Sequence, residues 1–249
     1  MARNRKVLLA LLTLVVLVVG GFLLWFYVIK EDAPPKLSTS DRDNALTSTS
    51  APVSSTAPPV GESSSTTAGA TASTSTGVDG TWNLVGADST VGYRVKEILG
   101  GLETEGAGRT SKVTGSLTIA GTRASAASFE VDMASITSNS ERRDGQFHDR
   151  IMSTKQFPTA TFTLTKPIDF GGVPADGQSV KASATGDLTL HGVTKSVTFD
   201  VDAKLQNGRI GVLGNIPVVF ADYQIPNPSN SFAKTEDHGL LEFVLVFAK

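Results

Sequence analysis

The chain has 249 residues, a formal net charge of −2 and a sequence pI near 5.9. It contains no cysteine, which excludes disulfides, thiolate catalysis, cysteine-ligated metal centres and a cysteine-linked lipid anchor. No basic patch stands out in the part of the sequence that we expect to fold, so nucleic acid is not an expected partner.

The N-terminus predicts a membrane anchor. A basic tail, residues 1–6, precedes residues 7–29, which are apolar apart from Thr13. More than about 18 apolar residues can cross a bilayer as a helix, and Trp25 and Tyr27 suit its far interface. The basic flank predicts a single-pass protein of the plasma membrane with a cytoplasmic N-terminus and an extracytoplasmic remainder. A cleaved secretory signal is the alternative, although its apolar region is usually only about 7–15 residues long.

Residues 30–78 are dominated by Ser, Thr, Ala, Pro and Gly and show no apolar periodicity. Such a segment cannot bury enough apolar surface to offset the entropy lost on ordering. We therefore expect a disordered linker, and its composition would also suit an O-glycosylated stalk.

Residues 79–249 are expected to form one all-β domain. Val91, Tyr93 and Val95 alternate with polar residues, as do several later segments, which is typical of half-buried strands. Asn207-Gly208 predicts a tight hairpin. No helical pattern alternates with the strands, so we expect an antiparallel barrel of about eight strands with one short helix.

The short helix is expected from Ser140 to Met152, with Phe147 and Ile151 on one face. Phe157-Pro158 should end it, because the residue before proline avoids the helical region. A helix with one apolar stripe would cover one end of the barrel and gate the access of a ligand.

The lumen is predicted to have room for a ligand. Ala182, Ala184 and Gly186 share one face of a strand, and a small barrel whose interior is not filled by side chains can hold a ligand. The aromatic side chains that could fill this space instead are Phe129, Phe162, Phe199 and Phe243.

No nucleophile elbow, phosphate-binding loop or metal motif is found, so neither a catalytic site nor a metal or other cofactor is predicted. His148, His191 and His238 lie far apart in sequence, and surface or structural roles are expected for them. A hydrolase or metal-dependent enzyme using Asp144, His148, Asp149 or His191 is the less favoured alternative, because charge runs on helices are usually solvated faces.

The last strand, residues 240–247, is apolar on both faces. One face can line the lumen, while the other can pack under the helix or against a partner, including a second copy in a homodimer. A filled barrel that acts as an interaction module of the cell envelope, without a ligand, is therefore a further alternative.

Several motifs resemble those of the YceI-like family. They are Arg143-Asp144, Phe157-Pro158-Thr159-Ala160-Thr161-Phe162, the segment from Gly186 to Val197 and Phe220-Ala221-Asp222-Tyr223, in the order and spacing of that family. The resemblance implies a lipocalin-like barrel that carries a polyisoprenoid or related lipid. Asp88, Lys96 and Gln146 stand where the family often has histidines, so any ligand contact made by those histidines is not implied here.

These observations predict a binding protein, not an enzyme, that sequesters a polyisoprenoid, an isoprenoid quinone or a fatty chain in its lumen. Each buried methylene contributes about 0.8 kcal/mol, so a long chain needs few polar contacts. The residues predicted to line the lumen are Tyr93, Met133, Phe147, Ile151, Phe162, Leu188, Leu190, Phe199 and Phe243.

Overall fold

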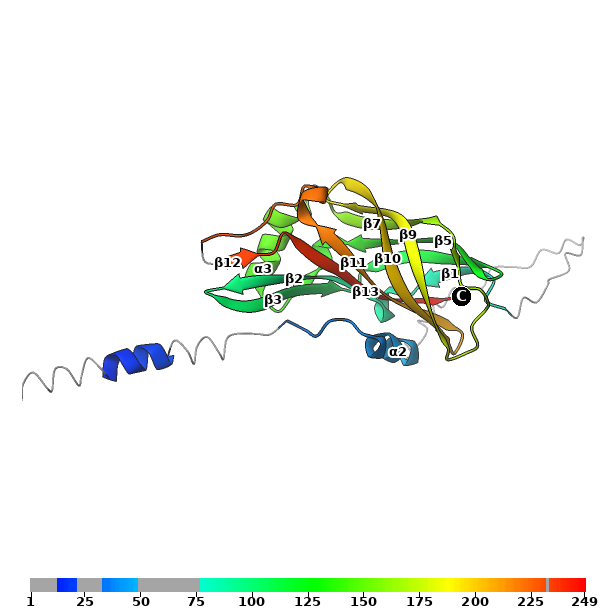
Figure 1. Ribbon diagram of the computed structural model, residues 1–249, viewed down its shortest axis with the longest axis horizontal. Helices are drawn as coiled ribbons and strands as arrows, with labels where there is room; N and C mark the ends of the chain where they lie inside the picture. The colour runs from blue at the N-terminus through cyan, green and yellow to red at the C-terminus, as the bar shows by residue number, and fades with distance from the viewer. Residues whose placement is uncertain (1–12, 22–32, 49–76, 232) are drawn as a thin grey trace, which may run out of the picture. The chain divides into compact units, whose positions relative to one another are not determined.

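The computed structural model describes residues 13–21, 33–48, 77–231 and 233–249. The chain divides into two compact units, Met1–Pro34 and Pro35–Lys249. In the first unit, residues 13–21 are helical (Figure 1). Among the described residues no helix is long and apolar enough to cross a membrane. The predicted anchor spans residues 7–29, and its residues 7–12 and 22–29 lie outside the described residues. The anchor therefore stays a prediction.

The second unit is an antiparallel barrel (Figure 1). Its long strands are β1 (Gly80–Leu84), β2 (Thr90–Leu99), β3 (Leu102–Thr110), β4 (Val113–Ala120), β5 (Arg123–Asp132), β7 (Thr159–Lys166), β9 (Ser179–Leu190), β10 (Val193–Gln206), β11 (Arg209–Val219) and β13 (His238–Ala248). The short strands are β6 (Thr137–Ser138), β8 (Ile168–Asp169) and β12 (Ala233–Thr235). The predicted all-β class is confirmed.

The barrel closes because β13 pairs with β11 on one side and with both β1 and β2 on the other. Strands β1 and β2 act as one interrupted strand, since β1 pairs with β4 and β2 pairs with β3. Counted in this way, with β3 and β4 likewise forming one strand, the closed barrel has the eight strands that the sequence predicts.

The predicted hairpin joins β10 to β11. Asn207 and Gly208 both have positive φ, 53° and 69°, as a type I′ turn requires, and Leu205 pairs with Ile210. The turn therefore fixes the register in which these two strands pair.

The predicted helix is confirmed between Ser140 and Met152. It consists of α3 (Glu141–Gln146) and a π-helical turn, η3 (Phe147–Ile151), and the hydroxyl of Ser140 caps its start. It ends before Phe157-Pro158, since Ser153 already has a φ of 47°. The 3₁₀ turns are η1 (Gly86–Asp88), η2 (Met133–Ser135) and η4 (Phe220–Tyr223).

The prediction of a disordered linker over residues 30–78 is wrong for Pro35–Ser48, which we call the docked segment. It contains the helix α2 (Thr39–Thr47), which lies against β11 and β13 (Figure 1). Leu37 and Leu46 are buried, and Arg42 forms an ion pair with Asp202 on β10. The segment looks polar in sequence because only two leucines carry its apolar contact.

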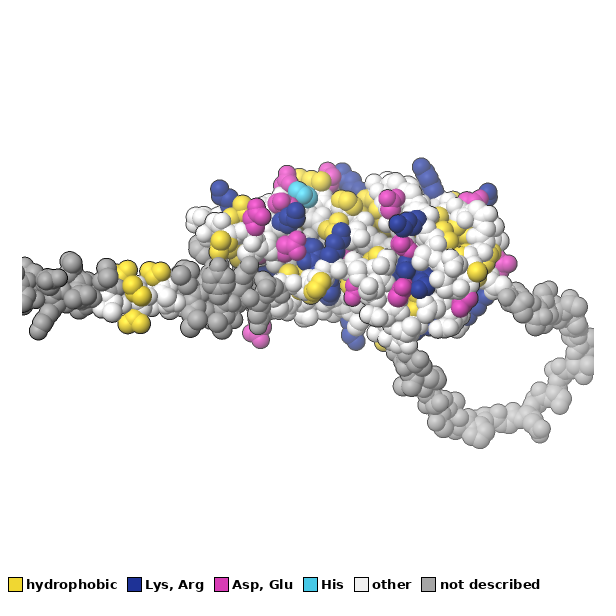
Figure 2. Space-filling view, turned by 60° about the horizontal axis from the view of Figure 1, so that its bottom comes forward, with side chains coloured by type: hydrophobic (Ala, Val, Ile, Leu, Met, Phe, Trp, Pro, Cys, Tyr) yellow, Lys and Arg dark blue, Asp and Glu magenta, His cyan; other side chains and the backbone are white. Residues whose placement is uncertain are grey.

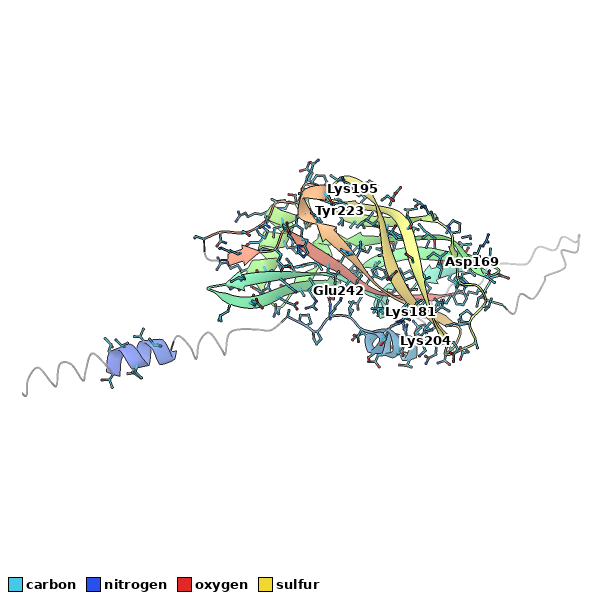
Figure 3. All side chains as sticks on the ribbon, in the orientation of Figure 1. Asp169, Lys181, Lys195, Lys204, Tyr223 and Glu242 are labelled. Carbon is cyan, nitrogen blue, oxygen red and sulfur yellow. The ribbon has the colours of Figure 1, made fainter. Side chains whose placement is uncertain are left out.

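A buried carboxylate ties the docked segment to the barrel. Glu242 on β13 is fully buried and accepts hydrogen bonds from Arg109 Nη2 at 2.7 Å and Arg94 Nε at 3.4 Å. It also accepts from the backbone N–H of Leu37 at 3.3 Å, while Arg109 donates to the carbonyl of Pro35. Figure 3 shows Glu242 on the side of the barrel along which this segment runs.

Both faces of β13 are occupied within the unit. Phe243 and Leu245 point to the lumen, whereas Glu242 and Val244 lie on the outer face and are buried beside the docked segment. The sequence left open whether this outer face packs under the short helix or against a partner, and in the structure the docked segment of the same chain lies on it. A homodimer has no support from this face, because the chain's own residues cover it.

Positive and negative side chains are interspersed over the face shown in Figure 2. Several are paired along the docked segment, for example Lys204 Nζ with Asp43 Oδ2 at 3.0 Å. This face therefore presents no continuous basic surface of the kind that tracks a nucleic acid backbone.

Candidate functional site

The lumen contains two cavities. The larger has a volume of about 590 Å³ and is lined by residues of α3, η3, β2 and β12, at the left end of the barrel in Figure 1. The smaller has a volume of about 140 Å³ and is lined by residues toward the opposite end, among them Val78, Ile168 and Phe247. The barrel is therefore not filled by its own side chains.

The wall of the larger cavity is built around a stacked pair of rings. Tyr93 on β2 and Phe147 on η3 lie parallel, with 4.7 Å between their centroids and 8° between their planes. Burial raises the pKa of the Tyr93 phenol above its ordinary value, so this group stays neutral at physiological pH. The stack fixes the helix against the strand and presents apolar surface to the cavity.

The larger cavity also has polar groups in its wall. Arg143 donates from Nη1 to Asn139 Oδ1 at 2.7 Å and lies 3.6 Å from Glu97. Arg142, from the same helix, is exposed at this cavity. The cavity thus combines an apolar wall with a few charged groups contributed by α3 and β2, an arrangement typical of small-molecule sites.

The smaller cavity is almost entirely apolar. Ala182 and Ala184 line it, so these small residues do leave space, as the sequence predicts. Its polar contributors are Ser128 and Lys204. Gly186 adds no space, because the ring of Phe162 lies against it; a Cβ at Gly186 would be 2.5 Å from Phe162 Cζ.

Four aromatic rings lie between the two cavities and form a closed cycle, which we call the phenylalanine layer: Phe129, Phe162, Phe199 and Phe243. Their successive centroid distances are 5.4, 5.3, 6.0 and 5.5 Å around the cycle from Phe129. Each ring belongs to a different strand, and each is at most 7% exposed. The alternatives of an open lumen and a lumen filled by these rings are therefore both realised, in different parts of the barrel.

The structure distributes the predicted lining residues among three places. Five of them line the larger cavity: Tyr93, Met133, Phe147, Ile151 and Leu190. Three belong to the phenylalanine layer and face the smaller cavity: Phe162, Phe199 and Phe243. Leu188 is fully buried and lines neither cavity, because it packs at the level of the layer. Binding of a ligand by these residues stays a prediction.

The predicted lining left out several apolar residues of the larger cavity, among them Phe220, Ile225, Leu240 and Leu241. The last two belong to the strand that was recognised as apolar on both faces. Phe220 belongs to η4 and Ile225 follows it, where period two gives no information about which side chains point inward.

The polar residues of the enzyme alternative make separate structural contacts. Asp144 accepts from the backbone N–H and the hydroxyl of Ser138 at 2.8 and 2.6 Å. His148 Nε2 lies 2.8 Å from the carbonyl of Ile136, and the ring of His191 packs on Phe157. Within the described residues no group of three or more His, Asp or Glu side chains could hold a metal ion.

The fold and its apolar cavities agree with the family comparison. The model of the YceI-like domain matches residues 82–247. The chain belongs to the YceI-like family. The family indicates a binding protein rather than an enzyme, which confirms the prediction made from the sequence.

Relatives of this family member include UPF0312 proteins. One from Vibrio campbellii is 33% identical over 116 residues, covering 43% of this chain and 58% of that protein. One from Vibrio vulnificus is 36% identical over 110 residues, covering 41% and 54%. The chain thus spans a little over half the length of these curated relatives.

Two solved structures share the fold. A polyisoprenoid binding domain from Saccharophagus degradans, implicated in plant cell wall breakdown, has a TM-score of 0.55 and 20% identity, covering 67% of this chain and 97% of that chain. BcnA of Burkholderia cenocepacia has a TM-score of 0.51 and 24% identity, covering 66% and 98%. At these identities the likeness establishes the fold.

Proposed function

We propose that this YceI-like barrel sequesters or carries a long apolar lipid, with the chain of the lipid in the larger cavity. The observation that carries the proposal is a cavity of about 590 Å³ with a mainly apolar wall. That volume lies within the range of about 300–1,000 Å³ that is typical of small-molecule sites. The ligand classes are a polyisoprenoid, an isoprenoid quinone or a fatty chain.

The energetics favour a hydrocarbon over a polar ligand. Side chains such as Met133, Ile136 and Leu190 offer no hydrogen bonds to a sugar or nucleotide. Removing apolar surface from water contributes about 0.8 kcal/mol per methylene, so affinity can come from the chain alone. Because the Saccharophagus domain of the same fold is a polyisoprenoid binding domain, polyprenols are the first ligands to test.

Blocking the larger cavity tests the proposal. Ala160 is buried and lines it, so Ala160→Phe would place a ring in the space that a lipid needs. We expect this variant to lose uptake of a labelled polyprenol. Ala126→Phe, at an exposed position of β5, should retain uptake and is the matched control. Equal uptake by both variants, with native circular dichroism, would place the ligand outside this cavity.

The proposal includes tethering of the barrel to the plasma membrane through residues 7–29, with the N-terminus cytoplasmic and the barrel extracytoplasmic. It is supported by the length of the apolar run and its basic flank. We expect the full chain to fractionate with membranes and the barrel to be digested by protease added to spheroplasts. If the barrel is protected from protease until the cells are lysed, the barrel is cytoplasmic and the proposed topology is wrong.

A further inference from the structure

We propose that the phenylalanine layer is the closed end of the larger cavity and limits the length of lipid chain that the barrel accepts. This inference rests on the proposed function and assigns specificity to four residues outside the larger cavity. The division of the lumen into two spaces arises only when the strands are assembled.

The inward-facing residues of each strand change from one cavity to the other at this layer. Along β13, Leu241 lines the larger cavity, Phe243 lies in the layer and Leu245 lines the smaller cavity. Along β5, Val131 lines the larger cavity and the next inward residue, Phe129, lies in the layer. The division is therefore about one side chain thick and lies at the same level on opposite sides of the barrel.

Buried aliphatic side chains and two glycines of neighbouring strands restrict the phenylalanine layer. Leu188 on β9 and Ile216 on β11 are almost completely buried, and neither lines a cavity. Glycines face two of the rings: Gly214 lies against Phe243 and Gly186 against Phe162, each too close to admit a Cβ. These two rings therefore have no room on the side of the glycines, so a lipid chain that reaches the layer meets a packed surface.

The space beyond the layer is apolar and would accept hydrocarbon if it were reached. Its volume of about 140 Å³ is similar to engineered apolar cavities that bind benzene. Phe199 contacts Phe162 and Phe243 and lines this smaller cavity. Removing the Phe199 ring would therefore extend the smaller cavity into the layer that separates the two spaces, without altering the residues that line the larger cavity.

The experiment measures the affinity of residues 35–249, a compact unit that contains the whole sheet and its core, for linear prenols lengthened one isoprene unit at a time. For the unaltered protein we expect each added unit to tighten binding by roughly tenfold or more until the chain reaches the layer, and no further gain after that. Phe199→Ala should move this plateau to prenols longer by at least one unit.

Two further variants make the test decisive. Phe199→Leu keeps more of the packing, so its plateau should shift less than that of Phe199→Ala. It replaces the alanine variant in the test if that variant fails to fold. Phe247→Ala enlarges the smaller cavity on a wall outside the layer, so its plateau should stay that of the unaltered protein. A folded Phe199 variant with an unchanged plateau, or an equal shift in Phe247→Ala, would overturn the inference. Failure of the unaltered protein to bind any prenol would contradict the proposed function itself, and this inference with it.

Discussion

Phe243 and Gly214 are direct partners across the strands β13 and β11, and the ring of Phe243 lies over the glycine. A Cβ at Gly214 would stand 2.3 Å from Cζ of Phe243, well inside van der Waals contact. The phenylalanine layer therefore depends on a glycine in the neighbouring strand, although glycine by itself weakens a strand.

Gly214→Ala should destabilise the barrel by about 1–3 kcal/mol, because the new methyl group forces the Phe243 ring off its position in a packed core. Urea unfolding followed by tryptophan fluorescence measures this change. Gly172→Ala is the control, since a Cβ there meets open space. Equal stabilities of the two variants would show that the ring has room to move.

Glu242→Gln should lower the free energy of unfolding by about 3–5 kcal/mol, because it leaves the guanidinium groups of Arg94 and Arg109 without their buried counter-charge. Glu103→Gln, an exposed change on β3, should stay within about 0.5 kcal/mol of the unaltered protein. The role given to Glu242 is contradicted if both variants unfold at the same urea concentration.

Leu46→Ala should release the docked segment while leaving the barrel folded. Leu46 is buried against Gly211 on β11, so the truncation removes much of the apolar contact that holds α2. Hydrogen exchange should become faster in residues 39–47 and stay unchanged in the barrel strands that do not contact α2. Asn44→Ala, at an exposed position of the same helix, should leave the exchange of α2 slow.

The stability of the N-terminal turn of α2 is expected to depend on pH through Asp41. The hydroxyl of Ser38 donates to Asp41 and lowers the pKa of that carboxyl below its ordinary value of 3.8. A lowered pKa contributes stability that is present above the ordinary value and lost as the pH falls through the lowered one. Ser38→Ala should raise the pKa of Asp41, measured by carboxyl NMR, whereas Ser48→Ala should not. If the pKa of Asp41 in the unaltered protein equals its ordinary value, the hydrogen bond from the Ser38 hydroxyl does not have the role given to it here.

The Tyr93–Phe147 stack predicts how the helix influences lipid exchange. Phe147→Leu removes the stacked ring and should speed the uptake and release of a fluorescent lipid, because α3 and η3 are held less firmly to β2. Phe157→Leu removes a ring that packs on His191 and should leave both rates unchanged. Identical rates in the two variants would argue against gating by this helix.

Local sequence patterns predicted the strands, the hairpin at Asn207-Gly208 and the helix near Phe147, because each depends on neighbours in the chain. They did not predict α2, since Leu37 and Leu46 are isolated apolar residues in a polar segment whose partners lie on distant strands. Period two identified Phe162 and Phe199 as inward-facing. It could not show that rings from different strands meet at one level, because that depends on the stagger of the strands around the barrel.

Native mass spectrometry of residues 35–249, purified without detergent and followed by organic extraction, tests the central claim most directly. The account predicts an adduct of defined mass that disappears on extraction, and renewed uptake of an added polyprenol, isoprenoid quinone or fatty chain. A protein that has the mass of the bare chain and takes up none of these lipids would contradict it.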